Sequence, residues 1–185
     1  MGLERTLAVL NSLDDNYQTD LFKPLIDRIE RDTGKKYHEN PKLTKDFRII
    51  TDHIKTSTFL VLEGVVPGNK GQEYVLRRLL RRAYVKMSLI SDQPTEKLLR
   101  LFDIVLQIYS IARDKTDKKH QVLEAELVKF SKTLKQGLKE LEKIKNIDGK
   151  TAFDLYQSYG FPLELTQELA IEKGHKINSQ QFQAE

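Results

Sequence analysis

Apolar residues recur every three or four positions along almost the whole chain, and this spacing constrains the fold more than any other feature. The clearest case is the seam of Leu123, Leu127, Phe130, Leu134, Leu138 and Leu141. Such spacing places side chains on one face of a helix, whereas a half-buried strand alternates every second residue. Strand-like patterns are confined to short stretches at 59–62 and 64–66. We therefore expect an all-α fold, an irregular bundle of about seven or eight helices with one long helix near 117–145.

Capping and chain-breaking residues divide this pattern into separate helices. Thr19 and Asp20 suit the start of the second helix and Gly34 suits its end. Pro67-Gly68-Asn69-Lys70-Gly71 forms a breaker-rich loop, and residues 146–150 form a turn-forming linker. The expected helices span approximately 4–11, 21–33, a helix after the polar 35–42 loop that holds Phe47, Ile50 and Ile54 and ends near Gly64, and then 74–89, 98–109, 117–145, 151–159 and 164–173.

Composition excludes several classes of protein. Charged residues make up 31% and hydrophobic residues 39% of the 185 residues, a globular composition rather than a disordered one. No apolar run reaches the ~18 residues of a membrane span, and the N-terminus does not resemble a signal peptide. The absence of cysteine excludes disulfides and thiolate metal sites and fits the cytoplasm. The four histidines are scattered without a metal-binding spacing, so no metal site, zinc included, is expected.

The run Arg77-Arg78-Leu79-Leu80-Arg81-Arg82 is the first candidate for function. On a helix, residues four apart share a face, so like charges are stacked in two pairs that repel each other. Leu76, Leu79, Leu80 and Ala83 would bury the opposite side, and Lys86 would extend the basic strip. Guanidinium groups match phosphate oxygens in pairs, which favours a nucleic-acid backbone. Internal salt bridges to neighbouring helices would explain the same residues equally well.

Two further segments carry groups that can recognise a ligand. The 67–71 loop precedes a helix, whose free N–H groups attract anions, and Asn69 adds an amide that both donates and accepts. A simple turn with a capping Asn remains the alternative. Gln157 lies among the aromatic residues of the 156–162 segment, as a contact residue or merely as an exposed one.

Several blocks of the sequence resemble one known family. They are Gly2-Leu3-Glu4-Arg5, Asp20-Leu21-Phe22, Arg48-Ile-Ile-Thr-Asp-His-Ile-Lys55, Gly64-Val-Val-Pro-Gly-Asn69, Tyr74-Val-Leu-Arg-Arg-Leu-Leu-Arg-Arg-Ala83, Gly149-Lys-Thr-Ala-Phe-Asp-Leu-Tyr156 and Tyr159-Gly-Phe-Pro-Leu-Glu-Leu-Thr166. In this order they are similar to the alanyl-tRNA synthetases of class II, from the end of the third signature motif onward. The resemblance covers nearly the whole chain.

The resemblance implies an activity and a domain organisation. The family activates alanine with ATP and Mg²⁺ and then esterifies the 3′ end of the tRNA, and Arg5 corresponds to the motif arginine that contacts ATP. The other parts of that active site lie upstream, so the chain alone is expected to be inactive and to bind neither cofactor. Residues 1–12 would end the catalytic core. Residues 13–146 would form the first part of the helical tRNA-recognition domain, and 147–185 a second helical subdomain, truncated at its C-terminus.

The resemblance also assigns tRNA contacts. The family identifies tRNA(Ala) by a G·U wobble pair in the acceptor stem, read by one Asn and one Asp. The Asn corresponds to Asn69, and the Asp position is occupied by Gln157. Our own hypothesis, from the arginine run, is that Arg77, Arg78, Arg81 and Arg82 contact the RNA backbone, and no DNA partner is expected.

This chain departs from the family pattern at two places. The Gln157 amide can still accept a hydrogen bond, but one methylene further out and without the charge that strengthens such bonds. Gly71-Gln72-Glu73 replaces the usual Gly-Arg-Gly, removing a positive charge and adding a negative one.

Two alternative functions stay open. One is a basic helical module that binds RNA without base specificity. The other is a protein-binding bundle that uses the 123–141 seam, which would then be an exposed apolar stripe.

Overall fold

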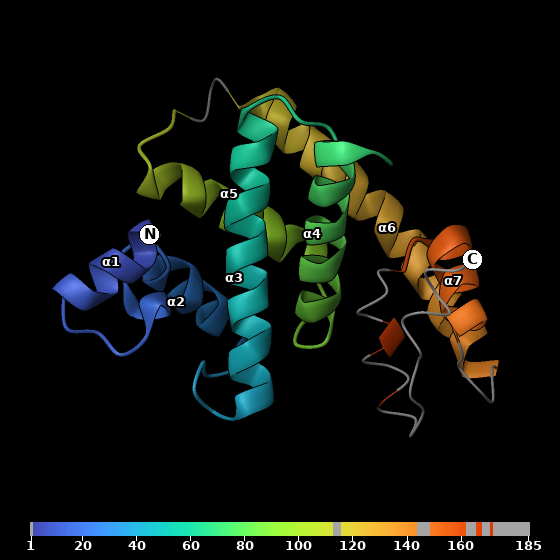
Figure 1. The fold of residues 1–185 in the computed structure, drawn as a ribbon, viewed down its shortest axis with the longest axis horizontal. Helices are drawn as coiled ribbons and strands as arrows, with labels where there is room; N and C mark the ends of the chain where they lie inside the picture. Colours follow the sequence, from blue (N-terminus) through green and yellow to red (C-terminus); the bar gives the residue numbers. More distant parts are fainter. Residues whose placement is uncertain (1, 113–115, 144–148, 162–165, 168–170, 172–185) are drawn as a thin grey trace. The chain divides into compact units, whose positions relative to one another are not determined.

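The computed structural model describes residues 2–112, 116–143, 149–161, 166–167 and 171 (Figure 1). Within these ranges the fold is all-α, as the apolar spacing predicts, and the short 59–62 and 64–66 stretches form no strand. None of the described helices is long and apolar enough to cross a membrane. The elements are α1 Leu3–Leu10, the short 3-10 helix η1 Asn16–Gln18, α2 Lys23–Thr33, α3 Pro41–Leu62, α4 Gly71–Ser88, α5 Pro94–Ile108, α6 Asp117–Lys143 and α7 Gly149–Tyr159. The helix predicted for 164–173 lies mostly outside the described residues.

Local sequence explains where the helices begin and end. The Asn40 side chain accepts from the backbone N–H of Leu43 at 2.8 Å, and Pro41 occupies the first position of α3, where its missing N–H costs nothing. Gly34 ends α2 in the left-handed conformation, with φ of 70°, which glycine adopts without strain. These signals place the N-terminal end of α3, which later forms part of the candidate interface.

Contacts divide the chain into two compact units, residues 1–124 and residues 125–185, so the division falls inside α6. In unit 1, α3 packs along α4 and also contacts α5 and α2, and Figure 1 shows α3 and α4 running side by side. Side chains without any exposed surface fill the space between these helices: Phe47, Ile50, Leu76, Leu80, Leu98 and Phe102. This boundary between compact units does not test the domain limits expected from the resemblance, near residues 12 and 146, which stay a prediction.

Unit 2 contains the C-terminal part of α6 and the helix α7. A Cβ at Gly137 would lie 2.4 Å from Cε2 of Phe161 and 3.0 Å from Cβ of Tyr159. Only glycine allows this close approach, and Phe161 is completely buried there.

The apolar seam of α6 is not an exposed stripe. Leu123, Leu127, Phe130 and Leu134 are all buried, and Leu138 is half-buried. The side chain of Leu141 lies outside the described residues. The seam packs inside the protein over this described part, which does not favour its use as a protein-binding surface.

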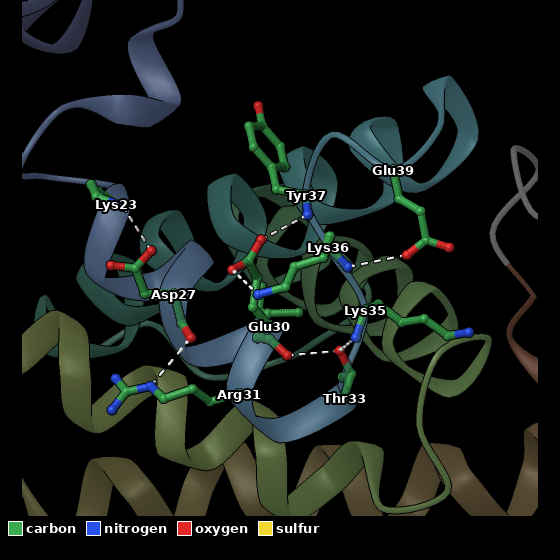
Figure 2. Close-up of polar contacts among 10 residues, drawn as sticks. Lys23, Asp27, Glu30, Arg31, Thr33, Lys35, Lys36, Tyr37 and Glu39 are labelled. Carbon is green, nitrogen blue, oxygen red and sulfur yellow. Dashed lines mark hydrogen bonds and ion pairs between the residues drawn. The ribbon is translucent and has the colours of Figure 1, made fainter.

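The segment between α2 and α3 is held by the carboxylate of Glu30. Figure 2 shows this carboxylate accepting from the backbone N–H of Tyr37 at 2.9 Å and from the Lys36 ammonium at 3.3 Å. The backbone N–H of Lys36 in turn donates to the Glu39 carboxylate at 3.2 Å. These bonds fix the short connection and so determine where Tyr37 and its neighbour His38 lie.

Candidate nucleic-acid interface

The 67–71 loop is braced by the first arginine of the run. One terminal nitrogen of Arg77 donates to the side-chain oxygen of Asn69, and the other donates to the backbone carbonyl of Pro67 at 3.1 Å. Asn69 itself is exposed. A side chain on the second turn of α4 therefore orients an exposed amide in the loop that precedes the helix.

Gly68 allows the loop to close against the start of α4. Its N–H donates to the Glu73 carbonyl at 3.1 Å. A Cβ at Gly68 would lie 2.0 Å from Oε2 and 2.7 Å from Cβ of Glu73, so a larger residue would have to displace this turn. Gly71 follows in the left-handed conformation, with φ of 52°. The Glu73 that departs from the family pattern is thus packed against the loop.

The arginine run does not form one uniform strip. Leu76, Leu80 and Ala83 are buried on the opposite side, as predicted, whereas Leu79 is half-buried. Arg78 is exposed and the other three arginines are half-buried. Arg77, Arg78 and Arg81 all interact with other groups of the chain, and both alternatives for the run, internal salt bridges and RNA contacts, stay predictions.

The prediction that Lys86 extends the basic strip is wrong. Its side chain is 6% exposed, and its ammonium lies 3.2 Å from the carboxylate of Asp46, which is 4% exposed. Five consecutive residues of α4, 83–87, are buried. The strip ends at Arg82 because the next five residues of α4 are all buried.

A hollow of about 610 Å³ lies at the N-terminal end of α3. We call it the basic hollow, because Lys45, Arg48 and Arg82 line it together with two histidines. Its complete lining is Tyr17, His38, Glu39, Asn40, Pro41, Thr44, Lys45, Arg48, Ile49, Asp52, His53 and Arg82. Arg82 thus faces a site to which the 67–71 loop contributes no residue.

A hydrogen-bond network holds Arg48 in the wall of the basic hollow. Its guanidinium donates to the Tyr37 hydroxyl at 2.6 Å and to the Asp15 carboxylate at 2.9 Å. The same carboxylate accepts from the Tyr37 hydroxyl at 2.8 Å and from the Tyr17 backbone at 3.0 Å. The guanidinium carbon lies 5.3 Å and 5.8 Å from the ring centres of Tyr17 and Tyr37, within the range of cation–π contacts.

This network changes the acidity of its members. Burial by itself raises the pKa of Asp15, but the bonds from Tyr17, Tyr37 and Arg48 outweigh it and lower that pKa below its ordinary value. Burial raises the pKa of Tyr37 to about 12. The bond to the Tyr37 hydroxyl, followed by the bond to Asp15, raises the pKa of Arg48. Asp15 is therefore a carboxylate and Arg48 a cation throughout the physiological range.

Gln157 lies on α7 in unit 2, where its side chain is exposed. On the same helix Ala152 and Leu155 are buried, while Tyr156 and Tyr159 are half-buried. The aromatic neighbours thus belong partly to the packing of unit 2, and Gln157 faces solvent. Its alternative interpretations, a contact residue or a merely exposed one, are both compatible with this position.

Arg5, the candidate ATP contact, is exposed on α1. The described residues include no group of three His, Asp or Glu side chains that could hold a metal ion.

Comparison with known proteins identifies the family. The family model described as "tRNA synthetases class II (A)" matches residues 1–185. The chain belongs to this family of class II tRNA synthetases.

Within this family, the chain is 41% identical over 197 aligned residues to an alanine–tRNA ligase of Staphylococcus saprophyticus and 40% identical to one of Staphylococcus aureus strain JH9. In both cases all of this chain is covered, but only 22% of the relative's length. The resemblance to the alanyl-tRNA synthetases that the sequence blocks carry is confirmed.

The structure also contains candidate residues that the sequence alone did not identify. Lys45, Arg48 and His38 line the basic hollow. Positions 41, 44, 45, 48 and 52 recur at spacings of three and four on the face of α3 opposite Phe47 and Ile50. The spacing of these polar residues could have been recognised in the sequence. The presence of Arg82 in the same site could not.

Proposed function

We propose that this chain is the part of an alanine–tRNA ligase that binds the acceptor stem of tRNA(Ala). The whole protein would attach alanine to that tRNA with ATP and Mg²⁺ in the cytoplasm. Residues 1–12, with Arg5 as an ATP contact, would end the catalytic core, and 13–146 and 147–185 would be the two parts of the tRNA-recognition domain. The family match and the names of the relatives support this assignment.

The bond between Arg77 and Asn69 carries the proposal for base recognition. The Asn69 carbonyl oxygen has two lone pairs, and Arg77 occupies one of them. The second can accept from the guanine 2-amino group of a G·U pair, which projects into the readable minor groove of an RNA helix. Because Arg77 already orients the amide, less rotamer freedom is lost when the RNA binds.

Gln157 is proposed as the second group that faces the base pair. It is exposed and uncharged, whereas the family pattern has Asp at this position. A carboxylate forms hydrogen bonds roughly twice as strong as a neutral acceptor does. We therefore expect Gln157→Asp to increase the preference for G·U over G·C.

Fluorescence anisotropy of labelled acceptor minihelices tests base recognition. G·U and G·C versions would be compared at about 0.15 M salt with wild type, Asn69→Ala and Gln157→Asp. A good base contact discriminates by about 1–3 kcal/mol, so we expect a roughly 5- to 150-fold preference for G·U in the wild type that Asn69→Ala reduces. Gln121→Ala, at another exposed amide, on α6, is the matched control and should leave the preference unchanged.

A basic module without base specificity is the second candidate function, favoured by the arginines on α4. It predicts equal binding of the two minihelices and a steep loss of affinity with salt. If Asn69→Ala left a wild-type preference for G·U intact, base recognition by this residue would be wrong. If no minihelix bound at all, both candidate functions would fail.

A further inference from the structure

We propose that the basic hollow at the N-terminal end of α3 binds a phosphate group of the RNA backbone. This inference rests on the proposed function, because it adds a second point of contact to the RNA held at the 67–71 loop. The basic hollow has a volume of about 610 Å³, which is ample for a phosphate with its adjoining sugar. The hollow lies entirely within unit 1.

Arg82 is the residue that most directly indicates an anionic ligand. Its Nε is shielded from solvent and has no hydrogen-bond partner among the described residues. A buried N–H that is left without an acceptor is costly, so such groups in native proteins normally meet a protein atom, a water or a ligand. A guanidinium group presents paired N–H donors that match two oxygens of one phosphate.

The two carboxylates in the lining are engaged with other groups. The Asp52 carboxylate lies 3.2 Å from Nδ1 of His53, and the Glu39 carboxylate accepts from the Lys36 backbone. Both carboxylates belong to exposed residues, where water screens their charge. The lining therefore holds three cations, Lys45, Arg48 and Arg82, against these two carboxylates.

Arg48 supplies a second guanidinium that is fixed in advance. Its bonds to Tyr37 and Asp15 and its position over two rings restrict its rotamers, so little conformational entropy remains to be lost on binding. Lys45 adds an exposed ammonium one turn earlier on α3. The N-terminus of this 22-residue helix contributes further partial positive charge at the same place.

We assign the phosphate to RNA because Arg82 lies on the same helix as Arg77, which braces the loop proposed to read the base pair. Arg77 and Arg82 are five residues apart, which on a helix is about 7.5 Å along the axis and about 140° around it. Arg77 braces the loop while Arg82 faces the basic hollow, so one RNA molecule would touch α4 at two separate places. A free phosphate offers the same chemistry, and the experiment distinguishes the two sources.

The test measures how minihelix affinity depends on salt for the 185-residue chain and three variants. Arg82→Gln and Lys45→Gln each remove one cation from the basic hollow. Arg31→Gln is the matched control, because Arg31 is an exposed arginine on α2 outside the hollow. Each lost phosphate contact should lower the slope of log affinity against log salt by about 0.9, which is about fivefold in affinity at 0.15 M salt. Lys45 is exposed, so its variant keeps the test valid should Arg82→Gln fail to fold.

The outcomes separate this inference from the proposed function. Shallower slopes for both hollow variants, with Arg31→Gln like the wild type, support it. If the wild type binds the minihelix and both hollow variants have its slope, the inference is wrong while the proposed function stands. Arg82-dependent binding of inorganic phosphate in calorimetry, with an unchanged RNA slope, overturns the assignment to RNA. A wild type that binds no minihelix overturns both.

Discussion

The buried ion pair between Asp46 and Lys86 offers a direct test of how unit 1 is held together. Replacing Asp46 by Leu removes the carboxylate that faces the Lys86 ammonium at 3.2 Å. Removing one partner of a buried pair costs about 3–5 kcal/mol, because the other charge stays in a poorly solvated place. Since the two side chains are only 4% and 6% exposed, this range applies rather than that of a surface pair. For a chain of this size the melting temperature should fall by on the order of 10 °C.

Urea unfolding followed by helical circular dichroism at neutral pH would measure the change in the free energy of unfolding. Lys23→Gln is the control, because Lys23 forms an exposed pair with Asp27 at 2.9 Å and should contribute only about 0–1 kcal/mol. A double variant, Asp46→Leu with Lys86→Met, removes both charges and puts apolar side chains in their place. It should recover most of the stability that the single variant loses.

Two results would refute this reasoning. If Asp46→Leu cost no more than Lys23→Gln, the pair would be solvated and would not hold α3 to α4. If the double variant were as unstable as the single one, the loss would come from altered packing and not from an uncompensated charge.

Two further predictions concern other parts of the chain. The pKa of Asp15 is lowered in the folded state, so its contribution to stability is complete above its ordinary pKa and is lost as the pH falls below it. Urea unfolding between about pH 5 and pH 3 should therefore show a steeper loss for wild type than for Asp15→Asn; parallel profiles would exclude the role of this carboxylate. Gly137→Ala should destabilise unit 2 by about 1–3 kcal/mol through its clash with Phe161, seen as faster amide exchange in α7. Unchanged exchange there would show that the ring moves aside without cost.

Helix positions could be predicted because the information is local. The apolar spacing and the cap residues lie within a few positions of the features that they determine, as for Asn40 at the start of α3 and Gly34 at the end of α2. Lys86 shows where this reasoning fails. Its place four residues after Arg82 predicts a shared exposed face, but the helix is buried on all sides from 83 to 87. Packing by distant segments decides this burial, and no local pattern records it.

The candidate interface depended even more on distant segments. Asn69 and the arginine run were recognisable as candidates, but the bond from Arg77 to Asn69 requires the loop to fold back over the start of α4. The basic hollow is built from η1, the segment before α3, α3 itself and one residue of α4. The sequence contains all of these residues without indicating that they meet.

The bracing of the loop changes how a substitution of Arg77 must be interpreted. Arg77→Gln would release both the Asn69 amide and the Pro67 carbonyl, so a loss of RNA affinity would not by itself identify a phosphate contact. The salt dependence separates the two roles. If Arg77 acts by orienting Asn69, we expect the preference for G·U over G·C to fall while the salt slope stays nearly unchanged. If it binds a phosphate, the slope should fall by about one and the preference should remain.

Because Arg77 and Asn69 are in direct contact, their substitutions should also be non-additive in a double-mutant cycle. Additive losses would mean that the two side chains contact the RNA independently and that the brace has no part in recognition.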